Sequence, residues 1–114
     1  MLVVNKEEIQ EGEMRGLEMD RLPVLVAKVD GRIYAVRNKC THLGCRLSDG
    51  RLDGLIVTCP CHGSKFDLSN GKVVEYVTKW PRILQKAVAL VMKDEEVFDV
   101  KTDTDKIEIS RHKR

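Results

Sequence analysis

The sequence lacks three features that would assign the protein to a broad class at once. Its longest uninterrupted apolar run, AVALVM at 87–92, is far shorter than the roughly 20 residues of a membrane-spanning helix, so no membrane insertion is expected. The N-terminus has no basic start followed by an apolar stretch and a cleavage site, so we expect no signal peptide and a cytoplasmic protein. The net charge is only +2, which gives no indication of a nucleic-acid partner.

Amide side chains are also scarce, with three Asn and two Gln in the chain, whereas charged residues make up 33%. This balance is typical of thermophilic proteins and favours such a source. The prediction bears on the cysteines, because intracellular disulfides are rare in mesophiles and commoner in hyperthermophiles.

The two ends of the chain carry most of the strand signals. A short strand is expected at 2–4, followed by one helical turn before Gly12. The β-rich runs on either side of Asp30-Gly31, within 23–36, predict a hairpin, because this dipeptide favours a two-residue turn. Residues 97–110 predict a second hairpin, with TDTD as its turn. The fold class is therefore expected to be mostly β.

The middle of the chain is richer in glycine and turn residues than the ends. With 114 residues the chain predicts one domain, 1–114, that contains a loop-dominated subdomain at about 38–71. Within it, 55–58 predicts a short strand and Asn70-Gly71 a turn. Beyond it, good helix formers with apolar residues on one face favour a helix at about 81–95 over a strand.

All four cysteines and two of the three histidines lie in two short motifs, CTHLGC and CPCHGS, which begin at Cys40 and Cys59. One residue separates Cys40 from His42, two separate Cys59 from His62, and 16 lie between the two pairs. Thiolates and imidazoles are the ligands of zinc and of iron–sulfur clusters. Two turn-prone loops could therefore hold one metal centre between them.

The chemistry of these residues leaves alternatives open. A Cys₂His₂ zinc site would need an unusually short CxH spacing and would leave Cys45 and Cys61 without a role. A thiol redox site at Cys59-Pro60-Cys61 is disfavoured, since the usual motif has two residues between its cysteines. A [2Fe-2S] cluster with two thiolates on one iron and two imidazoles on the other, as in a Rieske centre, uses the same ligand types.

The two motifs resemble the cluster-binding loops of Rieske iron–sulfur proteins in their ligand spacing and in their glycines. This resemblance implies a Rieske-like antiparallel β sandwich or barrel with a loop-rich cluster-binding subdomain. It implies one Rieske [2Fe-2S] cluster per chain, and its four ligands would be Cys40, His42, Cys59 and His62.

The same resemblance implies roles for the residues around these ligands. Gly44 and Gly63 would let backbone N–H groups approach the sulfides, and Ser64 would donate to a bridging sulfide. Cys45 and Cys61 would form a disulfide that ties the two loops together. Both histidines would lie near the surface, on the outer iron.

Two further positions bear on potential and docking. High-potential members of the family carry a Tyr that donates to a ligand sulfur where this chain has Phe66, which implies an intermediate potential. Leu43 would shield the cluster, and a protein electron donor and a protein electron acceptor would dock near His42, Leu43 and His62.

The disulfide is found in respiratory Rieske proteins and is usually absent from the ferredoxins of ring-hydroxylating dioxygenases. The chain thus resembles a soluble Rieske ferredoxin with respiratory-style loops. The implied function is one-electron transfer from a reductase to an acceptor such as an oxygenase or a respiratory component, not catalysis. The alternative is a small zinc-stabilised binding module. A cluster-free subunit, as in some nitrite reductases, is disfavoured by the intact ligand set.

Overall fold

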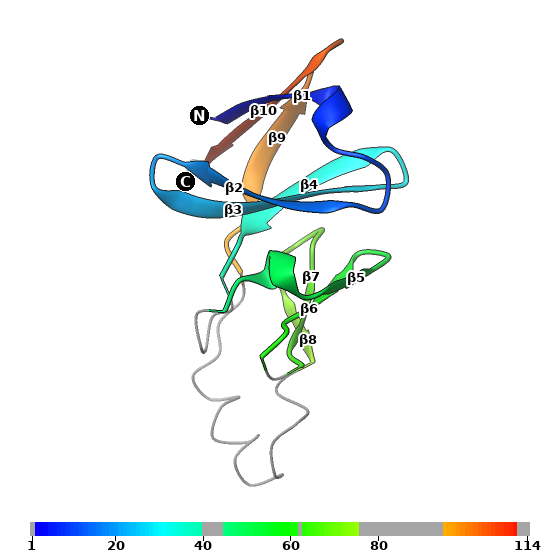
Figure 1. The fold of residues 1–114 in the computed structure, drawn as a ribbon, viewed down its shortest axis with the longest axis vertical. Coiled ribbons are helices and arrows are strands. Elements are labelled where there is room, and N and C mark those ends of the chain that lie inside the picture. The colour runs from blue at the N-terminus through cyan, green and yellow to red at the C-terminus, as the bar shows by residue number, and fades with distance from the viewer. Residues whose placement is uncertain (1, 40–44, 62, 76–94, 112–114) are drawn as a thin grey trace, which may run out of the picture.

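Strands dominate the computed structural model, which describes residues 2–39, 45–61, 63–75 and 95–111 (Figure 1). In these segments they form three antiparallel sheets, with the orders β1-β10-β9, β2-β3-β4 and β5-β6-β7-β8. The elements are β1 Leu2–Asn5, η1 Lys6–Glu8, β2 Met14–Met19, β3 Leu22–Val29, β4 Arg32–Arg37, η2 Leu47–Asp49, β5 Arg51–Asp53, β6 Ile56–Thr58, β7 Lys65–Asp67, β8 Val73–Glu75, β9 Phe98–Thr102 and β10 Lys106–Arg111. The mostly β fold class predicted from the sequence is confirmed.

The two predicted hairpins are both present. Strands β3 and β4 pair with Val29 opposite Arg32, and both turn residues have positive φ, 52° at Asp30 and 77° at Gly31. A type I′ turn requires this geometry, which Asp-Gly adopts readily. Strands β9 and β10 form the second hairpin, and β1 adds to β10 as an antiparallel neighbour. The helical turn expected before Gly12 is the 3-10 turn η1.

Other strands were not expected from the sequence. Strand β2 pairs along its whole length with β3, although Arg15, Gly16 and Glu18 interrupt its apolar pattern. Of the four three-residue strands of the β5–β8 sheet, only β6 was anticipated, within the predicted strand at 55–58. The helix predicted at about 81–95 lies outside the described residues except for Glu95. Among described residues, no helix has the length and apolar character to cross a membrane.

Strand β3 links two apolar clusters, because successive side chains of a strand point to opposite faces. Val24 and Val26 belong to the cluster that also contains residues of β1, β9 and β10. Leu25 and Ala27 belong to the other cluster, together with buried residues of η2, β6 and β7. All four β3 side chains are fully buried. One face of β3, together with Val36 of β4, therefore packs against the β5–β8 sheet and η2. Figure 1 shows this sheet beside the part that contains β3 and β4.

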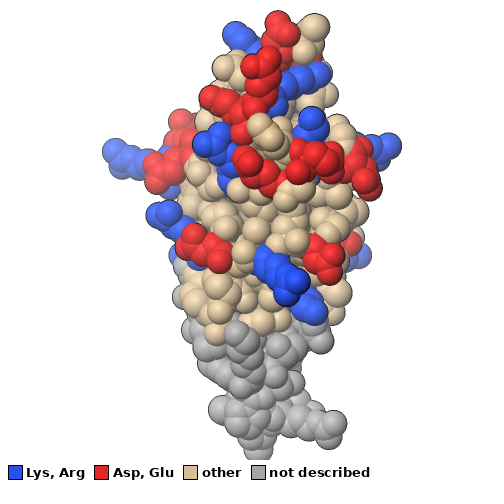
Figure 2. All heavy atoms as spheres, turned by 45° about the vertical axis from the view of Figure 1, so that its right-hand side comes forward, with Lys and Arg blue, Asp and Glu red and all other residues tan. Residues whose placement is uncertain are grey.

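Charged side chains of both signs are interspersed on the face of the molecule shown in Figure 2. Acidic groups lie next to Lys and Arg over the part that contains the two three-stranded sheets. On this face the described residues form no extended basic stripe, which is the usual electrostatic footprint of a nucleic-acid-binding surface.

Candidate metal centre

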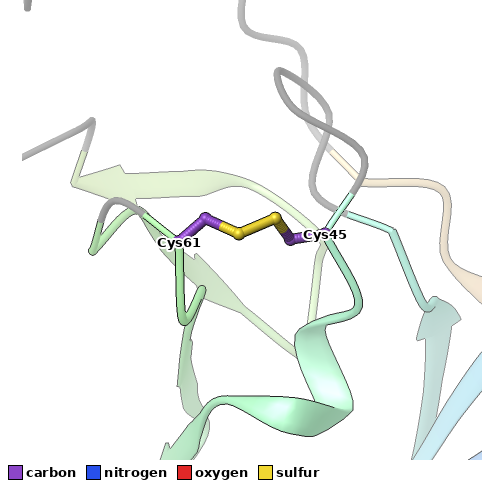
Figure 3. The surroundings of a disulfide bond; sticks show 2 residues. All are labelled: Cys45 and Cys61. Atoms are coloured by element: carbon purple, nitrogen blue, oxygen red, sulfur yellow. A yellow bond between two sulfur atoms is a disulfide. The ribbon is translucent and has the colours of Figure 1, made fainter.

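A disulfide between Cys45 and Cys61 joins the two cysteine-containing motifs (Figure 3). Cys45 lies just before η2 and Cys61 lies in the turn after β6, at a sequence separation of 16 and with 6.5 Å between their Cα atoms. Both side chains are partly buried and pack against the apolar cluster that contains Leu47 and Val57. The pairing implied by the family resemblance is confirmed.

Cys59 lies beside this disulfide but takes no part in it. Its side chain is buried, and its Sγ lies within 4.8 Å of the Sγ atoms of both Cys45 and Cys61. Those two sulfur atoms are bonded to each other, so they cannot act as thiolate ligands of a metal. Of these three described cysteines, only Cys59 therefore keeps a donor atom for a metal centre.

The turn between β6 and β7 is closed by two backbone hydrogen bonds. The amide of Cys59 donates to the carbonyl of Ser64 at 2.7 Å, and the amide of Gly63 donates to the carbonyl of Cys59 at 3.1 Å. Gly63 has a φ of 79°, a left-handed conformation that glycine adopts without the penalty of a Cβ. Ser64 is fully buried. The glycine and the serine singled out from the sequence thus shape the turn that carries Cys59.

Phe66 lies on β7 opposite Val57 of β6, and its side chain is almost completely buried. It belongs to the same apolar cluster as Cys59. Phe66 is thus a core aromatic that packs in the cluster containing the predicted ligand, and its effect on a redox potential stays a prediction. Five other predicted site residues lie outside the described residues: Cys40, His42, Leu43, Gly44 and His62.

A polar pair closes the base of the first motif loop, and the sequence reasoning did not find it. The side-chain amide of Asn38 donates from Nδ2 to Ser48 Oγ at 2.8 Å, and the backbone amide of Ser48 donates to Asn38 Oδ1 at 2.8 Å. Asn38 is 3% exposed. The available signal was an asparagine, scarce in this chain, immediately before the motif.

Residues 1–86 match the family model of the Rieske [2Fe-2S] domain. The chain belongs to this family. It is 38% identical over 68 residues to the ferredoxin component of the naphthalene 1,2-dioxygenase/salicylate 5-hydroxylase systems of Ralstonia sp., a match that covers 60% of this chain and 65% of the relative. It is 39% identical over 67 residues to the ferredoxin component of the Pseudomonas putida naphthalene 1,2-dioxygenase system, covering 59% and 64%. The matches thus span slightly less than two thirds of these relatives.

The Rieske fold also matches a solved structure over nearly the whole chain. The ferredoxin of carbazole 1,9a-dioxygenase from Nocardioides aromaticivorans IC177 superposes with a TM-score of 0.79, covering 96% of this chain and 95% of that one. The identity is 21%, so this match concerns the fold alone. The antiparallel Rieske-like fold expected from the motifs is confirmed.

The described residues of this Rieske domain fit a [2Fe-2S] cluster, the group that its family implies. Cys59 offers a buried sulfur, and iron–sulfur clusters are held by thiolates. The sulfur atoms of Cys45 and Cys61 are bonded to each other, so they do not compete with Cys59 as metal ligands. The remaining donors of the Rieske set, one thiol and two imidazoles, are present in the sequence of the two motifs.

Proposed function

We propose that this Rieske domain is a one-electron carrier that passes electrons from a reductase to an oxygenase. The observation that carries the proposal is the arrangement of Cys59, which is buried in a closed turn beside a disulfide that joins both motifs. The similarity to ferredoxin components of naphthalene dioxygenase systems supports an oxygenase as the acceptor. A bound Rieske cluster supplies reversible one-electron chemistry.

In this proposal four residues hold the cluster. Cys40 and Cys59 ligate one iron through thiolates, and His42 and His62 ligate the other through imidazoles. Two imidazoles in place of two thiolates leave the centre less negative, which raises its potential above that of all-cysteine clusters. The zinc alternative would use the same four residues, so metal content separates the two.

The chain's other residues keep this ligand set in place. The Cys45–Cys61 disulfide fixes the first motif to the second, and the hydrogen bonds of the β6–β7 turn fix the backbone of Cys59. Burial of Cys59 and Phe66 in one apolar cluster keeps water from this side of the centre. We propose that partner proteins dock near His42, Leu43 and His62.

Metal content and redox titration test the carrier function. We expect anaerobically purified protein to contain two irons and two acid-labile sulfides per chain, to accept one electron, and then to give a Rieske-type EPR signal. Zinc in place of iron, with no spectral change on reduction, would overturn the proposal and favour the zinc-stabilised module.

Matched substitutions test the division of the residues into ligands and crosslink. Cys59→Ser should abolish the cluster, whereas Cys45→Ser/Cys61→Ser, which removes both crosslinked sulfurs, should leave iron and sulfide bound. His42→Ala should likewise remove the Rieske EPR signal, whereas His112→Ala, at the remaining histidine, should not. Loss of iron in Cys45→Ser/Cys61→Ser together with its retention in Cys59→Ser would reverse the assignment.

The proposal also places the carrier in the cytoplasm, as expected from the sequence. Cell fractionation tests this location. Cells of the source organism should be fractionated and the chain detected in each fraction by mass spectrometry. Recovery of the chain in the cytoplasmic fraction supports the location, and recovery of the chain only outside that fraction contradicts it.

A further inference from the structure

Asn38 and Ser48 hold the base of the first motif loop, and neither residue is a proposed metal ligand. Asn38 follows β4 directly, and its backbone amide donates to the carbonyl of Pro23 at 2.9 Å, which extends the β3–β4 ladder by one position. Its side chain then bonds twice to Ser48 of η2, once as a donor and once as an acceptor. The start and the end of segment 39–47 are thereby fixed to each other and to the sheet.

Gly16 of β2 provides the space for this pair. A Cβ on Gly16 would lie 2.9 Å from Asn38 Nδ2 and 3.0 Å from Ser48 Oγ, closer than such atoms normally approach. Its φ is not in the left-handed region, so glycine is needed here for room and not for backbone conformation. The unexpected strand β2 therefore has a function in the fold: it is the surface on which the Asn38–Ser48 pair rests.

The fixed segment carries residues that matter for the centre. Cys40, a proposed ligand, lies two positions after Asn38, and Cys45 of the disulfide lies three positions before Ser48. The polar pair therefore joins the two flanks of this segment, and the crosslink attaches it a second time at Cys45. Joining the two flanks of a loop lowers the number of conformations that the loop can reach.

We propose that Asn38 is a positioning residue for the Rieske centre, acting with Ser48 and through the segment that contains Cys40. The pair closes the base of the loop and thereby slows the loss of the cluster. Asparagine suits this position because a single side chain supplies both the acceptor for the Ser48 amide and the donor for its hydroxyl oxygen. Removing the Ser48 hydroxyl leaves the buried Nδ2 of Asn38 without its acceptor, and removing Asn38 leaves the half-buried Ser48 without both hydrogen bonds, which is unfavourable. The inference rests on the proposed ligand set.

The test compares cluster loss with overall stability. Holoprotein should be incubated with an iron chelator well below its unfolding temperature, and the decay of its visible absorption followed. We expect Asn38→Ala, Ser48→Ala and Gly16→Ala to lose the cluster at least about tenfold faster than wild type, which corresponds to ~1.4 kcal/mol. The control is Val26→Ala, a fully buried residue of the other apolar cluster, which should lower the unfolding temperature but leave the loss rate within about twofold.

A conservative variant separates positioning from a general packing defect. In Asn38→Asp, carboxylate oxygens can accept from both the amide and the hydroxyl of Ser48, so we expect most of the cluster lifetime to return. If Asn38→Ala fails to fold, the rates of Ser48→Ala and Gly16→Ala decide the question by the same comparison.

The failures of the two proposals are distinguishable. A wild-type protein without iron, sulfide and a Rieske EPR signal would overturn the proposed function, and the positioning role with it. A wild-type protein that holds the cluster while Asn38→Ala and Ser48→Ala lose it no faster than Val26→Ala would overturn the positioning role alone.

Discussion

Phe66 and Val57 face each other across β7 and β6, and both side chains are buried in the apolar cluster that contains Cys59. One aromatic ring therefore belongs both to the core that attaches the β5–β8 sheet and to the surroundings of a proposed iron ligand. The ring carries no hydroxyl, so it contributes packing but no hydrogen bond to a sulfur.

We therefore expect Phe66→Tyr to raise the midpoint potential of the centre. A hydroxyl that donates to a ligand sulfur stabilises the more negative, reduced state. A net hydrogen bond of about 1 kcal/mol corresponds to ~40 mV for one electron. The potential should be measured by spectroelectrochemical titration beside Tyr34→Phe, which removes a hydroxyl from a residue packed at the edge of the same cluster. An unchanged or lower potential in Phe66→Tyr would contradict the assigned role.

The Cys45–Cys61 crosslink should stabilise both the fold and the centre. For a separation of 16 residues, loop-closure entropy predicts a contribution of about 3 kcal/mol to the free energy of unfolding. The variant to use is Cys45→Ser/Cys61→Ser, because a single change would leave a thiol close to Cys59. We expect a lower midpoint in urea and faster cluster loss at high temperature. A reductant should weaken wild type but leave the double variant unchanged, and equal lifetimes for both proteins would show that the crosslink is not structural.

The parts of the fold that could be predicted from the sequence are those with characteristic turn residues. The β3–β4 hairpin was predictable because Asp30-Gly31 favours the positive φ values that its turn adopts. Strand β2 was not, because its pairing with β3 is stabilised by neighbours distant in sequence and its own pattern contains Gly16 and charged residues. The three-residue strands around β6 are too short for an alternation to be recognised.

The candidate site likewise contains residues that could be identified from the sequence and residues that could not. The family resemblance implied that Cys45 and Cys61 pair with each other and are not among the proposed ligands, and the structure contains that disulfide. Asn38 could not be assigned in this way, because its role depends on Ser48 and on the close approach of Gly16 from another strand. Such a relationship exists only in three dimensions.

Glu11 should make the stability of the fold depend on acid pH. Its carboxylate accepts the amides of Asp30 at 2.7 Å and Gly31 at 2.9 Å. The hydrogen bond from Gly31, then that from Asp30, holds the pKa of Glu11 below its ordinary value of 4.5, with a smaller contribution from Lys28. Because the pKa is lower in the folded state, the stabilisation is present above pH 4.5 and is lost as the pH falls through the folded-state pKa.

Glu11→Gln tests this dependence, because it removes the charge and leaves one oxygen to accept a hydrogen bond. We expect the variant to be less stable than wild type in urea at pH 7, and the difference to disappear at pH values below the folded-state pKa of Glu11. Glu18→Gln, an exposed glutamate on β2, is the control. A difference between wild type and Glu11→Gln that stays constant down to the lowest pH would exclude the charge as its cause.

Gly71, the glycine of the β7–β8 turn, should tolerate substitution poorly. Its φ is 74°, and its carbonyl accepts the amide of Glu95 at 2.7 Å. A Cβ at Gly71 would overlap the carbonyl oxygen of Glu95 and lie 2.8 Å from Val97 Cγ2. Gly12 is the matched control, because its φ is 77° and a Cβ there would meet nothing within 4 Å. Gly12→Ala thus measures the left-handed conformation alone, about 1–2 kcal/mol.

We expect Gly71→Ala to destabilise the protein by about 1–3 kcal/mol more than Gly12→Ala does, because the added methyl group must push the backbone at Glu95 away. Urea unfolding of the two variants beside wild type gives both values. The additional loss of stability in Gly71→Ala, beyond that in Gly12→Ala, measures how strongly the chain before β9 resists displacement from the β7–β8 turn. Equal losses of stability in Gly12→Ala and Gly71→Ala would show that the contact of Gly71 with Glu95 and Val97 adds no cost. The penalty at Gly71 would then come from its backbone conformation alone.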